Sequence, residues 1–97
     1  TVVFAEGSWT MEEPSQLGRY QRTFGTRQGE IRWDLLAAGL GCHGELVERL
    51  DELDGALVRA QAHAGPSLVC IRTDLDANRA LPAGIRERFD EAYTGPS

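Results

Sequence analysis

Glu6, Gly7 and Ser8 follow directly after a short apolar stretch, and their residue types could hold a metal ion. Val2-Val3-Phe4 is rich in β-branched and aromatic residues and is bounded by a glycine-containing loop, which predicts a buried strand. Open parallel sheets bind ligands outside the carboxyl ends of their strands. Glu6 offers a hard oxygen suited to Mg²⁺, and Gly7 lets the backbone approach an ion closely. The alternative is an ordinary turn with an exposed Glu6 and a packed Trp9, and the local residues alone favour that alternative.

Two histidines and two cysteines are the other side chains whose types could do chemistry. His43 lies in a predicted loop, and His63 lies near a predicted helix C-terminus, where a partly charged imidazole is favourable. The sequence has no Ser–His–Asp arrangement, HExxH motif or P-loop, so we expect structural or solvated roles for both histidines. Cys42 and Cys70 form no C-x-x-C pair. Cys70, within SLVCI, is typical of a small buried hydrophobe, and we expect no disulfide between the two.

The composition is that of one small globular domain. The chain has 97 residues, of which 41% are hydrophobic and 26% charged. The net charge of −5 gives no electrostatic reason to expect nucleic acid or an anionic membrane as a partner. No apolar run approaches the roughly 20 residues of a membrane-spanning helix, and no signal-peptide pattern is present. We therefore expect a cytoplasmic protein.

Strands that alternate with helices must position these residues. Period-2 and continuous apolar patterns predict strands, and apolar residues at i, i+3, i+4 and i+7 predict helices. Residues 68–71 form a continuous apolar run, the kind of strand that helices cover on both faces. The alternation predicts an α/β fold with a mostly parallel sheet flanked by helices. The predicted strands are 2–4, 45–48 and 68–71, and the predicted helices are 14–20, 33–40 and 53–64.

The ends of the predicted helices carry their own signals. Pro14 suits the first turn of a helix. Thr10 and Glu13 mimic a capping box, although Pro14 would then remove one of the donors that such a box serves. Gly41 is a typical left-handed stop. In the polar tail, residues 83–93 have the pattern of a short helix. Three strands make a narrow sheet, so we expect an incomplete portion of a larger fold.

A series of motifs follows the first strand in a fixed order. VVFAEGSWTM is followed by a loop with Gly25-Thr26 and by Trp33, which opens a helix that closes with Leu40-Gly41. Then come Gly44 with ELVE, the acidic helix opening DEL, and the strand of GPSLVCIRTD. This order, over about residues 2–76, resembles the C-terminal stretch of the diphosphate-binding domain of thiamine diphosphate enzymes. The likeness is closest to the acetolactate synthase and benzaldehyde lyase branch.

The resemblance implies a site in the loop after the first strand. In that family the second residue of an Asn-Asn or Asn-Asp pair gives Mg²⁺ a side-chain oxygen, and the residue two further on gives a backbone carbonyl. By position these would be Glu6 and Ser8. The metal then bridges the protein to the diphosphate of the cofactor. The implied cofactor-binding residues are Glu6, Gly7, Ser8, Trp9, Thr10 and Met11.

Three positions depart from the family pattern. Ala5 replaces the first Asn, Glu6 is one methylene longer than Asn or Asp, and Thr10 replaces a frequent Gly. Because Mg²⁺ demands near-ideal octahedral geometry, the loop must absorb the extra length of Glu6. Thr10 restricts the backbone beside the expected cofactor.

Two parts of the family's catalytic machinery have no counterpart in the sequence. These are the Gly-Asp-Gly segment with the other metal ligand, and the glutamate that activates the cofactor, which comes from another domain. We therefore expect residues 1–76 to be the C-terminal portion of the cofactor-binding domain, with 77–97 as a polar tail. The chain would be a fragment or a small split subunit, not catalytic alone. The rest of the enzyme, or a partner subunit, would supply the missing parts, and we expect a homo-oligomer.

Two functions from different classes follow. The resemblance implies a thiamine diphosphate- and Mg²⁺-dependent lyase or transferase, acting on 2-oxo acids or 2-hydroxy ketones by decarboxylation or carboligation. The alternative is a stand-alone α/β module without catalysis that binds a partner protein through the exposed edge of its sheet. Val2, Val3 and Phe4 would give that edge a tendency to self-associate.

Overall fold

A computed structural model describes residues 1–79 and 88, which fall into two compact units. The first unit consists of residues 1–6 and 30–73 and contains the sheet. The second consists of residues 7–29 and the described residues from 74 onward. The helix predicted over 83–93 lies outside the described residues, apart from position 88.

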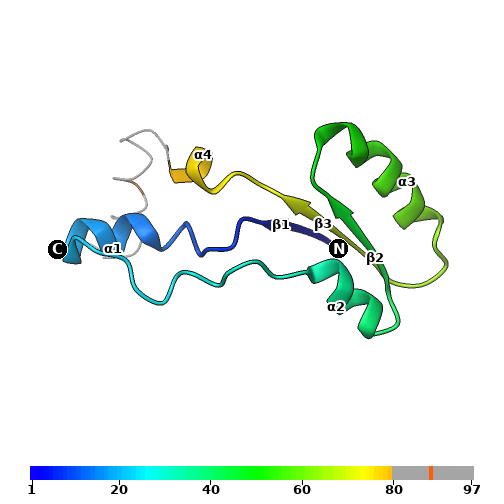
Figure 1. The fold of residues 1–97 in the computed structure, drawn as a ribbon, viewed down its shortest axis with the longest axis horizontal. Helices are drawn as coiled ribbons and strands as arrows, with labels where there is room; N and C mark the ends of the chain where they lie inside the picture. Colours follow the sequence, from blue (N-terminus) through cyan, green and yellow to red (C-terminus); the bar gives the residue numbers. More distant parts are fainter. Residues whose placement is uncertain (80–87, 89–97) are drawn as a thin grey trace. The chain divides into compact units, whose positions relative to one another are not determined.

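The first unit is built on a three-stranded parallel sheet (Figure 1). Its strands are β1 (Val2–Ala5), β2 (His43–Val47) and β3 (Ser67–Arg72). Their order is β1-β3-β2, so the last strand in the sequence lies between the other two. Val69 lies opposite both Val2 and Glu45 in the register. The predicted α/β fold with a parallel sheet is confirmed.

One face of the sheet packs on α3 (Leu53–Ala62), which a short 3₁₀ helix, η1 (Leu50–Glu52), precedes. Val47, Ala56 and Val69 are the buried centre of this layer. They come from three different elements, so this small cluster holds α3 on β2 and β3. The partly buried side chains packed against the cluster are Leu53, Leu57, Ala60 and Ile71.

The other face packs on α2 (Trp33–Gly39), whose first turn lies against β2. Gly44 makes this approach possible, because a Cβ there would collide with the carbonyl oxygen of Asp34. Asp34 is buried and accepts two hydrogen bonds from Arg32, at 2.9 and 2.7 Å, which lower the pKa of its carboxyl group. Cys70 on β3 is buried, and burial raises the pKa of its thiol. Cys42 and Cys70 are both free thiols, as expected.

The apolar stripe predicted for α2 is only partly buried. Ala37 is buried, as the periodicity predicts, but Leu36 is half exposed and Leu40 is 75% exposed. The neighbouring Leu35 is exposed as well. The helix is short, and a sheet of three strands covers only one side of it. This part of the prediction is therefore wrong for Leu36 and Leu40 in the described chain.

The boundaries of β2 and of the helices differ in detail from the sequence prediction. The strand β2 begins at His43, two residues earlier than predicted, because His43 already pairs with Ser67 of β3. The helix α3 ends at Ala62, with His63 in an extended conformation, and η1 was not foreseen. A further helix, α4 (Leu75–Arg79), was not predicted either. Gly41 has φ +81°, the left-handed stop that the sequence indicates.

In the second unit, α1 (Glu13–Tyr20) has Pro in its first turn, as expected. The capping-box pattern of Thr10 and Glu13, against which Pro14 argued, does not form, because the N-cap residue is Glu12 and makes no side-chain capping bond. The carboxylate of Glu13 instead accepts hydrogen bonds from Ser8 and Thr26. The helix ends at Tyr20, and its C-cap residue Gln21 lies in the left-handed region, with φ 58°.

The loop after α1 is tied back to the helix. The Gln16 side chain accepts a hydrogen bond from the Phe24 amide at 2.9 Å and donates one to the Phe24 carbonyl at 3.1 Å. The rings of Tyr20 and Phe24 pack edge to face. These contacts give residues 21–29 a defined path, in which the bridge at Arg27 is the one regular backbone pairing that the structure describes.

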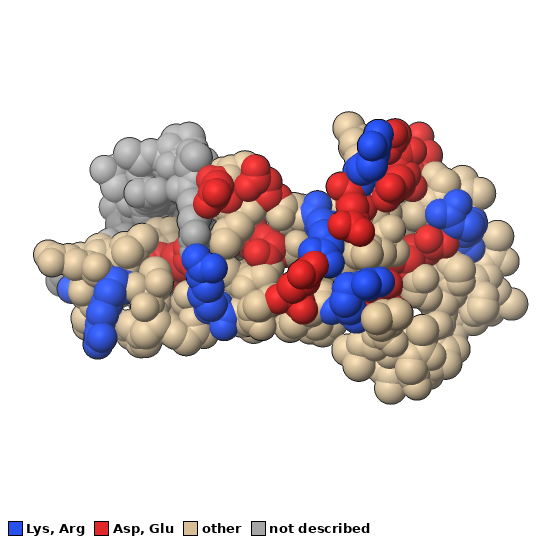
Figure 2. Space-filling model, viewed as in Figure 1, with Lys and Arg blue, Asp and Glu red and all other residues tan. Residues whose placement is uncertain are grey.

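Charged side chains of both signs lie next to one another on the first unit (Figure 2). Arg32 pairs with Asp34, and Arg49 pairs with Asp51. All ten basic residues of the chain are arginines, against 15 acidic residues. Among the described residues, no helix is both long enough and apolar enough to cross a bilayer.

Candidate functional site

The predicted site residues are the segment that directly follows β1 in the sequence. Glu6 is the last residue of the first segment of the sheet-containing unit, directly after Ala5. Gly7, Ser8, Trp9, Thr10 and Met11 open the second unit. Glu6 is partly buried and has an interaction of its own in the structure. The prediction that the loop leaves the carboxyl end of a parallel strand is confirmed.

Ser8 sits in a short antiparallel bridge opposite Arg27. The Trp9 amide donates to the Thr26 carbonyl at 2.8 Å, and the Gln28 amide donates to the Gly7 carbonyl at 2.9 Å. These two bonds flank the bridge, which makes Ser8 and Arg27 a non-hydrogen-bonded pair. The amide and carbonyl of Ser8 itself therefore point away from the 26–28 segment. Because the Ser8 carbonyl points away from that segment, its oxygen is directed so that a bound group could contact it.

Gly7 is required by the backbone on two counts. Its φ of +79° lies in the region that residues with a side chain rarely adopt. A Cβ on Gly7 would also lie 3.0 Å from the Gly29 carbonyl oxygen. The sequence predicted a glycine that lets the backbone approach an ion. The structure shows that Gly7 lets residues 7 and 29 approach each other, which fixes the path of the loop.

Trp9 and Met11 present large apolar surfaces. Trp9 is 58% exposed and Met11 is more than half exposed, while Thr10 is partly buried. The alternative of a Trp9 packed into the fold is wrong for the described chain, because most of its ring surface is open. Exposed aromatic and thioether side chains beside a polar loop suit an apolar ligand group.

The carboxyl edge of the sheet carries a second set of polar groups. The Thr73 amide donates to the Ala5 carbonyl at 3.2 Å, so Thr73 and Glu6 follow the last paired residues of neighbouring strands. The hydroxyl oxygen of Thr73 is buried and has no hydrogen-bond partner in the described chain. A buried hydroxyl without a partner is unusual in a folded protein, and it marks this edge as one that another polar group can complete.

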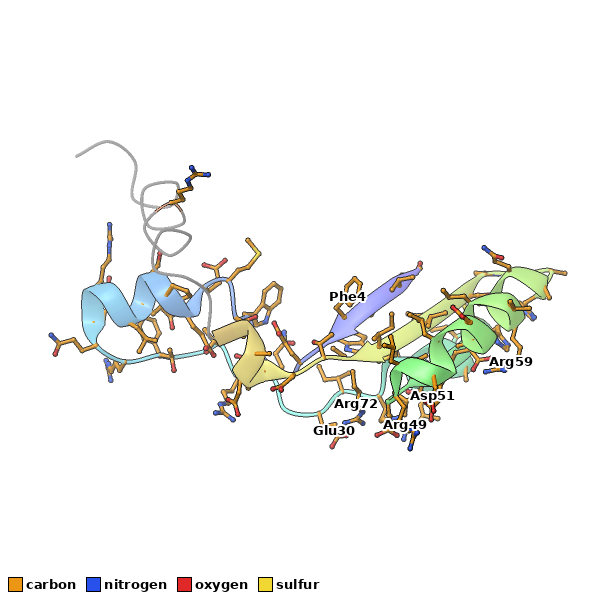
Figure 3. The ribbon with its side chains drawn as sticks, turned by 90° about the horizontal axis from the view of Figure 1, so that it is seen from above. Phe4, Glu30, Arg49, Asp51, Arg59 and Arg72 are labelled. Carbon is orange, nitrogen blue, oxygen red and sulfur yellow. The ribbon has the colours of Figure 1, made fainter. Side chains whose placement is uncertain are left out.

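Arg72 fixes the segments on either side of this edge. Its guanidinium pairs with Glu30, which precedes α2, and its Nε lies 3.7 Å from a carboxylate oxygen of Glu48, which follows β2. Figure 3 shows Arg72 and Glu30 pointing toward each other. The Arg72 side chain is partly exposed and both carboxylates are more than half exposed, so water screens these ion pairs. The positive charge of Arg72 is already engaged by these carboxylates.

Taken unit by unit, these residues fit a diphosphate-bound Mg²⁺ in part. Glu6 in the first unit has a carboxylate and Ser8 in the second has a backbone carbonyl, and oxygen is the ligand type that Mg²⁺ takes. Within residues 1–79 and 88, no group of three or more His, Cys, Asp or Glu side chains is assembled that could hold a metal.

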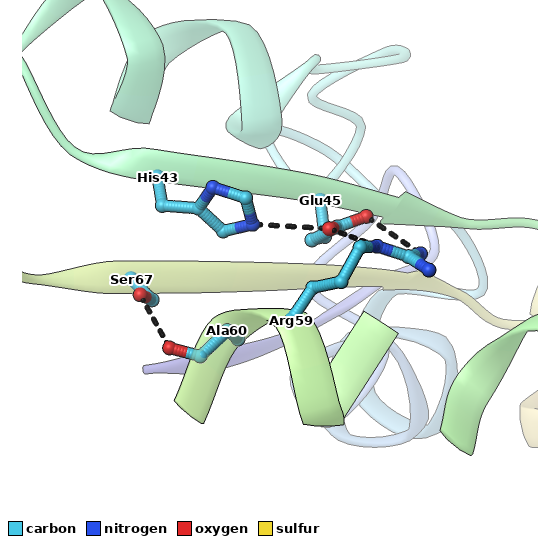
Figure 4. A network of polar contacts seen from close by, with 5 residues as sticks. All are labelled: His43, Glu45, Arg59, Ala60 and Ser67. Carbon is cyan, nitrogen blue, oxygen red and sulfur yellow. Dashed lines mark hydrogen bonds and ion pairs between the residues drawn. The ribbon is translucent and has the colours of Figure 1, made fainter. Parts of the chain in front are cut away.

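The histidines belong to a different part of the first unit. His43 contacts a carboxylate oxygen of Glu45 at 3.0 Å, and Arg59 of α3 donates two hydrogen bonds to the same carboxylate, at 2.7 and 3.2 Å (Figure 4). The Arg59 contact, and then the His43 contact, lower the pKa of Glu45. The rings of His43 and His63 are stacked with their centroids 5.2 Å apart. His43 thus has structural partners, as expected.

Sequence reasoning missed three residues that the structure singles out. Glu13 and Thr26 are buried and contact Ser8, and Thr73 has the unpaired hydroxyl. Glu13 was noted only as part of a capping-box pattern that Pro14 argues against, and Thr26 as part of a family motif in a loop. Their polar side chains are visible in the sequence. That the segments of Glu13 and Thr26 turn back onto Ser8 is visible only in the structure.

The comparison with known families agrees with the fold and with the order of motifs. The family described as the thiamine pyrophosphate enzyme, C-terminal TPP binding domain, matches residues 1–71. Thiamine pyrophosphate is the cofactor also called thiamine diphosphate. The match runs from β1 to the penultimate residue of β3 and includes the whole loop from Glu6 to Met11. It shows that this chain belongs to the C-terminal cofactor-binding domain family of thiamine pyrophosphate enzymes.

Proposed function

We propose that this chain contributes the diphosphate–metal loop of a thiamine diphosphate- and Mg²⁺-dependent enzyme. The enzyme acts on 2-oxo acids or 2-hydroxy ketones, by decarboxylation or carboligation of the acetolactate synthase type. The family match over residues 1–71 carries the proposal. The loop after β1 supports the metal part of it, because the Ser8 carbonyl points away from its own ladder.

The residues of the chain divide the work of binding between them. Glu6 and the Ser8 carbonyl hold the metal, and Gly7 keeps the loop in its left-handed turn. Trp9, Thr10 and Met11 line the cofactor, with the exposed Trp9 and Met11 offering apolar surface. When bound, thiamine diphosphate supplies a nucleophilic carbon and an electron sink for reactions next to a carbonyl. The part of the protein is to anchor and orient it.

Catalysis by this enzyme needs a second polypeptide or another segment of the same one. The described residues assemble no metal site from side chains alone. A Gly-Asp-Gly segment would add the other metal ligand, and a glutamate from a neighbouring domain would activate the cofactor. We propose that the rest of the enzyme, or a partner subunit, provides both, within a homo-oligomer.

Calorimetric titration with thiamine diphosphate tests this function. The cofactor is added to the 97-residue chain, alone and mixed with a polypeptide that carries a Gly-Asp-Gly segment, with Mg²⁺ or with a chelator. We expect Mg²⁺-dependent binding in the mixture. Glu6→Gln should weaken it by about tenfold or more, because the metal loses a charged ligand. Asp54→Asn removes one exposed carboxylate from α3 and should leave the affinity unchanged.

A folded chain that takes up no cofactor in either arrangement would overturn the proposal. Equal affinity with Mg²⁺ and with the chelator would overturn its metal part. A loss of affinity in Asp54→Asn as large as in Glu6→Gln would show a general charge effect and would also count against Glu6 as a ligand.

One observation favours the second candidate, a module that binds a protein partner without catalysis. Phe4 on the edge strand β1 is 71% exposed and stands out from the strand (Figure 3). An exposed apolar strand edge is a template for pairing with another chain. This candidate predicts capture of a partner without cofactor uptake, so the same titration separates the two.

A further inference from the structure

Glu13 is a buried carboxylate for which neither the fold nor the proposed function has yet accounted. It is the first residue of α1 and only 3% exposed. Burying a carboxylate is expensive unless it is hydrogen-bonded or paired. The first turn of a helix favours a negative charge, but acidic side chains at that position are usually exposed to solvent. Its burial therefore needs a specific reason.

The contacts of Glu13 converge on the loop after β1. The Ser8 hydroxyl lies 2.7 Å from Oε1 of Glu13, and the Thr26 hydroxyl lies 3.4 Å from the same oxygen. The Ser8 hydroxyl also lies 3.1 Å from the Thr26 carbonyl. A hydroxyl has only one proton to donate. Because the distance to Glu13 is the shorter of the two, the Ser8 hydroxyl donates its proton to Glu13. Hydrogen bonds from a hydroxyl to a carboxylate are short and roughly twice as strong as neutral ones.

These contacts fix the backbone of Ser8 from both sides. The side chain of Ser8 is held by Glu13, and the neighbouring Trp9 amide is held by the Thr26 carbonyl at 2.8 Å. Ser8, Glu13 and Thr26 are all buried. With the side chain and the ladder both fixed, the Ser8 carbonyl has one direction, away from the 26–28 segment.

We infer that Glu13 is a positioning residue, which holds the Ser8 carbonyl ready for the metal-bound diphosphate through the Ser8 hydroxyl. This inference rests on the proposed function. Glu13 itself touches neither metal nor cofactor. Its part is to remove the freedom of the loop before binding, so that less of the binding free energy is lost in ordering it.

Two substitutions in the full chain separate positioning from ligation. Ser8→Ala keeps the backbone carbonyl, which is the proposed metal ligand. It removes the side-chain hydroxyl and with it the hydrogen bond to Glu13. Glu13→Ala deletes the same link from the other side. Each should weaken Mg²⁺-dependent uptake of thiamine diphosphate by about tenfold, the effect of one lost hydrogen bond to a charged group. Glu13→Gln retains an acceptor oxygen and should restore most of the affinity.

The double variant Ser8→Ala/Glu13→Ala tests whether the two residues act together. If they act through one hydrogen bond, the double variant should bind no more weakly than either single variant. Additive losses, or full affinity in Ser8→Ala, would overturn the inference. So would a Glu13→Gln variant that is as weak as Glu13→Ala while both remain folded.

Amide hydrogen exchange without any ligand keeps this test independent of the proposed function. The Trp9 amide, which the same network holds, should exchange about tenfold faster in Glu13→Ala and at the original rate in Glu13→Gln. Unchanged exchange in Glu13→Ala would overturn the positioning role. Faster exchange of the Trp9 amide in Glu13→Ala, together with no cofactor uptake by the original chain, would support the positioning role of Glu13 and reject the proposed function.

Discussion

A side chain at Gly44 would have its Cβ 2.9 Å from the carbonyl carbon of Asp34 and in collision with the oxygen. The first turn of α2 lies against β2 at this point, so the atom in the way is backbone and cannot swing aside. The sequence pattern indicates a glycine here only through the family resemblance. Glycine is required at position 44 because the backbone of Asp34, ten positions earlier, comes so close. No local sequence pattern predicts that contact.

Gly44→Ala should therefore destabilise the chain by about 1–3 kcal/mol, the usual cost of forcing extra volume into a packed layer. Denaturant unfolding of the full chain measures it. Gly39→Ala is the matched control, because a Cβ at the end of α2 meets nothing within 4 Å. The control should be neutral, or stabilising by up to about 1 kcal/mol. Equal stability of the two variants would contradict the close approach.

At the scale of elements, ion pairs and hydrogen bonds join α3 to the sheet at several points. Arg59 reaches Glu45 on β2, and the Ser67 hydroxyl donates to the Ala60 carbonyl at 2.9 Å (Figure 4). Glu45 sits on the same face as Val47, in line with the period of a strand. The strand and the helix were both predicted from apolar spacing, but their pairing was not, because a charged residue on a strand is usually assigned to solvent.

The lowered pKa of Glu45 makes one part of the stability depend on pH. Because the folded-state pKa lies below the unfolded value of about 4.3, the contribution is complete above that value and is lost as the pH falls through the folded pKa. Thermal unfolding between pH 7 and pH 3 should show this loss, and Glu45→Gln should flatten it. Asp54→Asn, which removes an exposed carboxylate from α3, should keep the acid loss. The same steepness in Glu45→Gln would contradict the assignment.

Sequence patterns predicted the elements of the sheet-containing unit better than the faces that they bury. The continuous run in β3 and the spacing in α3 were sufficient, because a small core forms wherever those stripes meet. The boundary of β2 was missed because it depends on the pairing with β3. The helix α4 was missed although a local signal exists, since the Asp74 carboxylate accepts hydrogen bonds from the amides of Asp76 and Ala77. The loop that was predicted to hold the site does follow β1. Its buried support, Glu13 and Thr26, depends on a turn of the chain that spacing does not encode.

At the scale of the whole molecule, the open edge of β1 governs how the chain meets other molecules. Val2 and Phe4 are exposed along a strand that has a neighbour on one side only in the described sheet. Such an edge can accept a further strand, whether from a larger sheet or from a second copy. The exposed leucines of α2 add apolar surface elsewhere on the same unit.

We expect the isolated chain to self-associate through this edge. Phe4→Lys should shift the chain toward the monomer, because a charge on an edge strand opposes pairing. Light scattering over a range of concentrations measures the shift. Leu50→Lys, at an exposed leucine on η1, should leave the association unchanged. A clean monomer of the unchanged sequence at high concentration would contradict the prediction.

The order β1-β3-β2 also has a consequence for synthesis on the ribosome. The two outer strands bond only to β3, and β3 ends at Arg72. Until residues 67–72 have been synthesised, neither β1 nor β2 can form its pairing with β3. The pairing of β1 with β3 joins segments that are far apart in the sequence, and such contacts close slowly. During that delay the apolar strand Val2–Ala5 is open to pairing with a wrong partner.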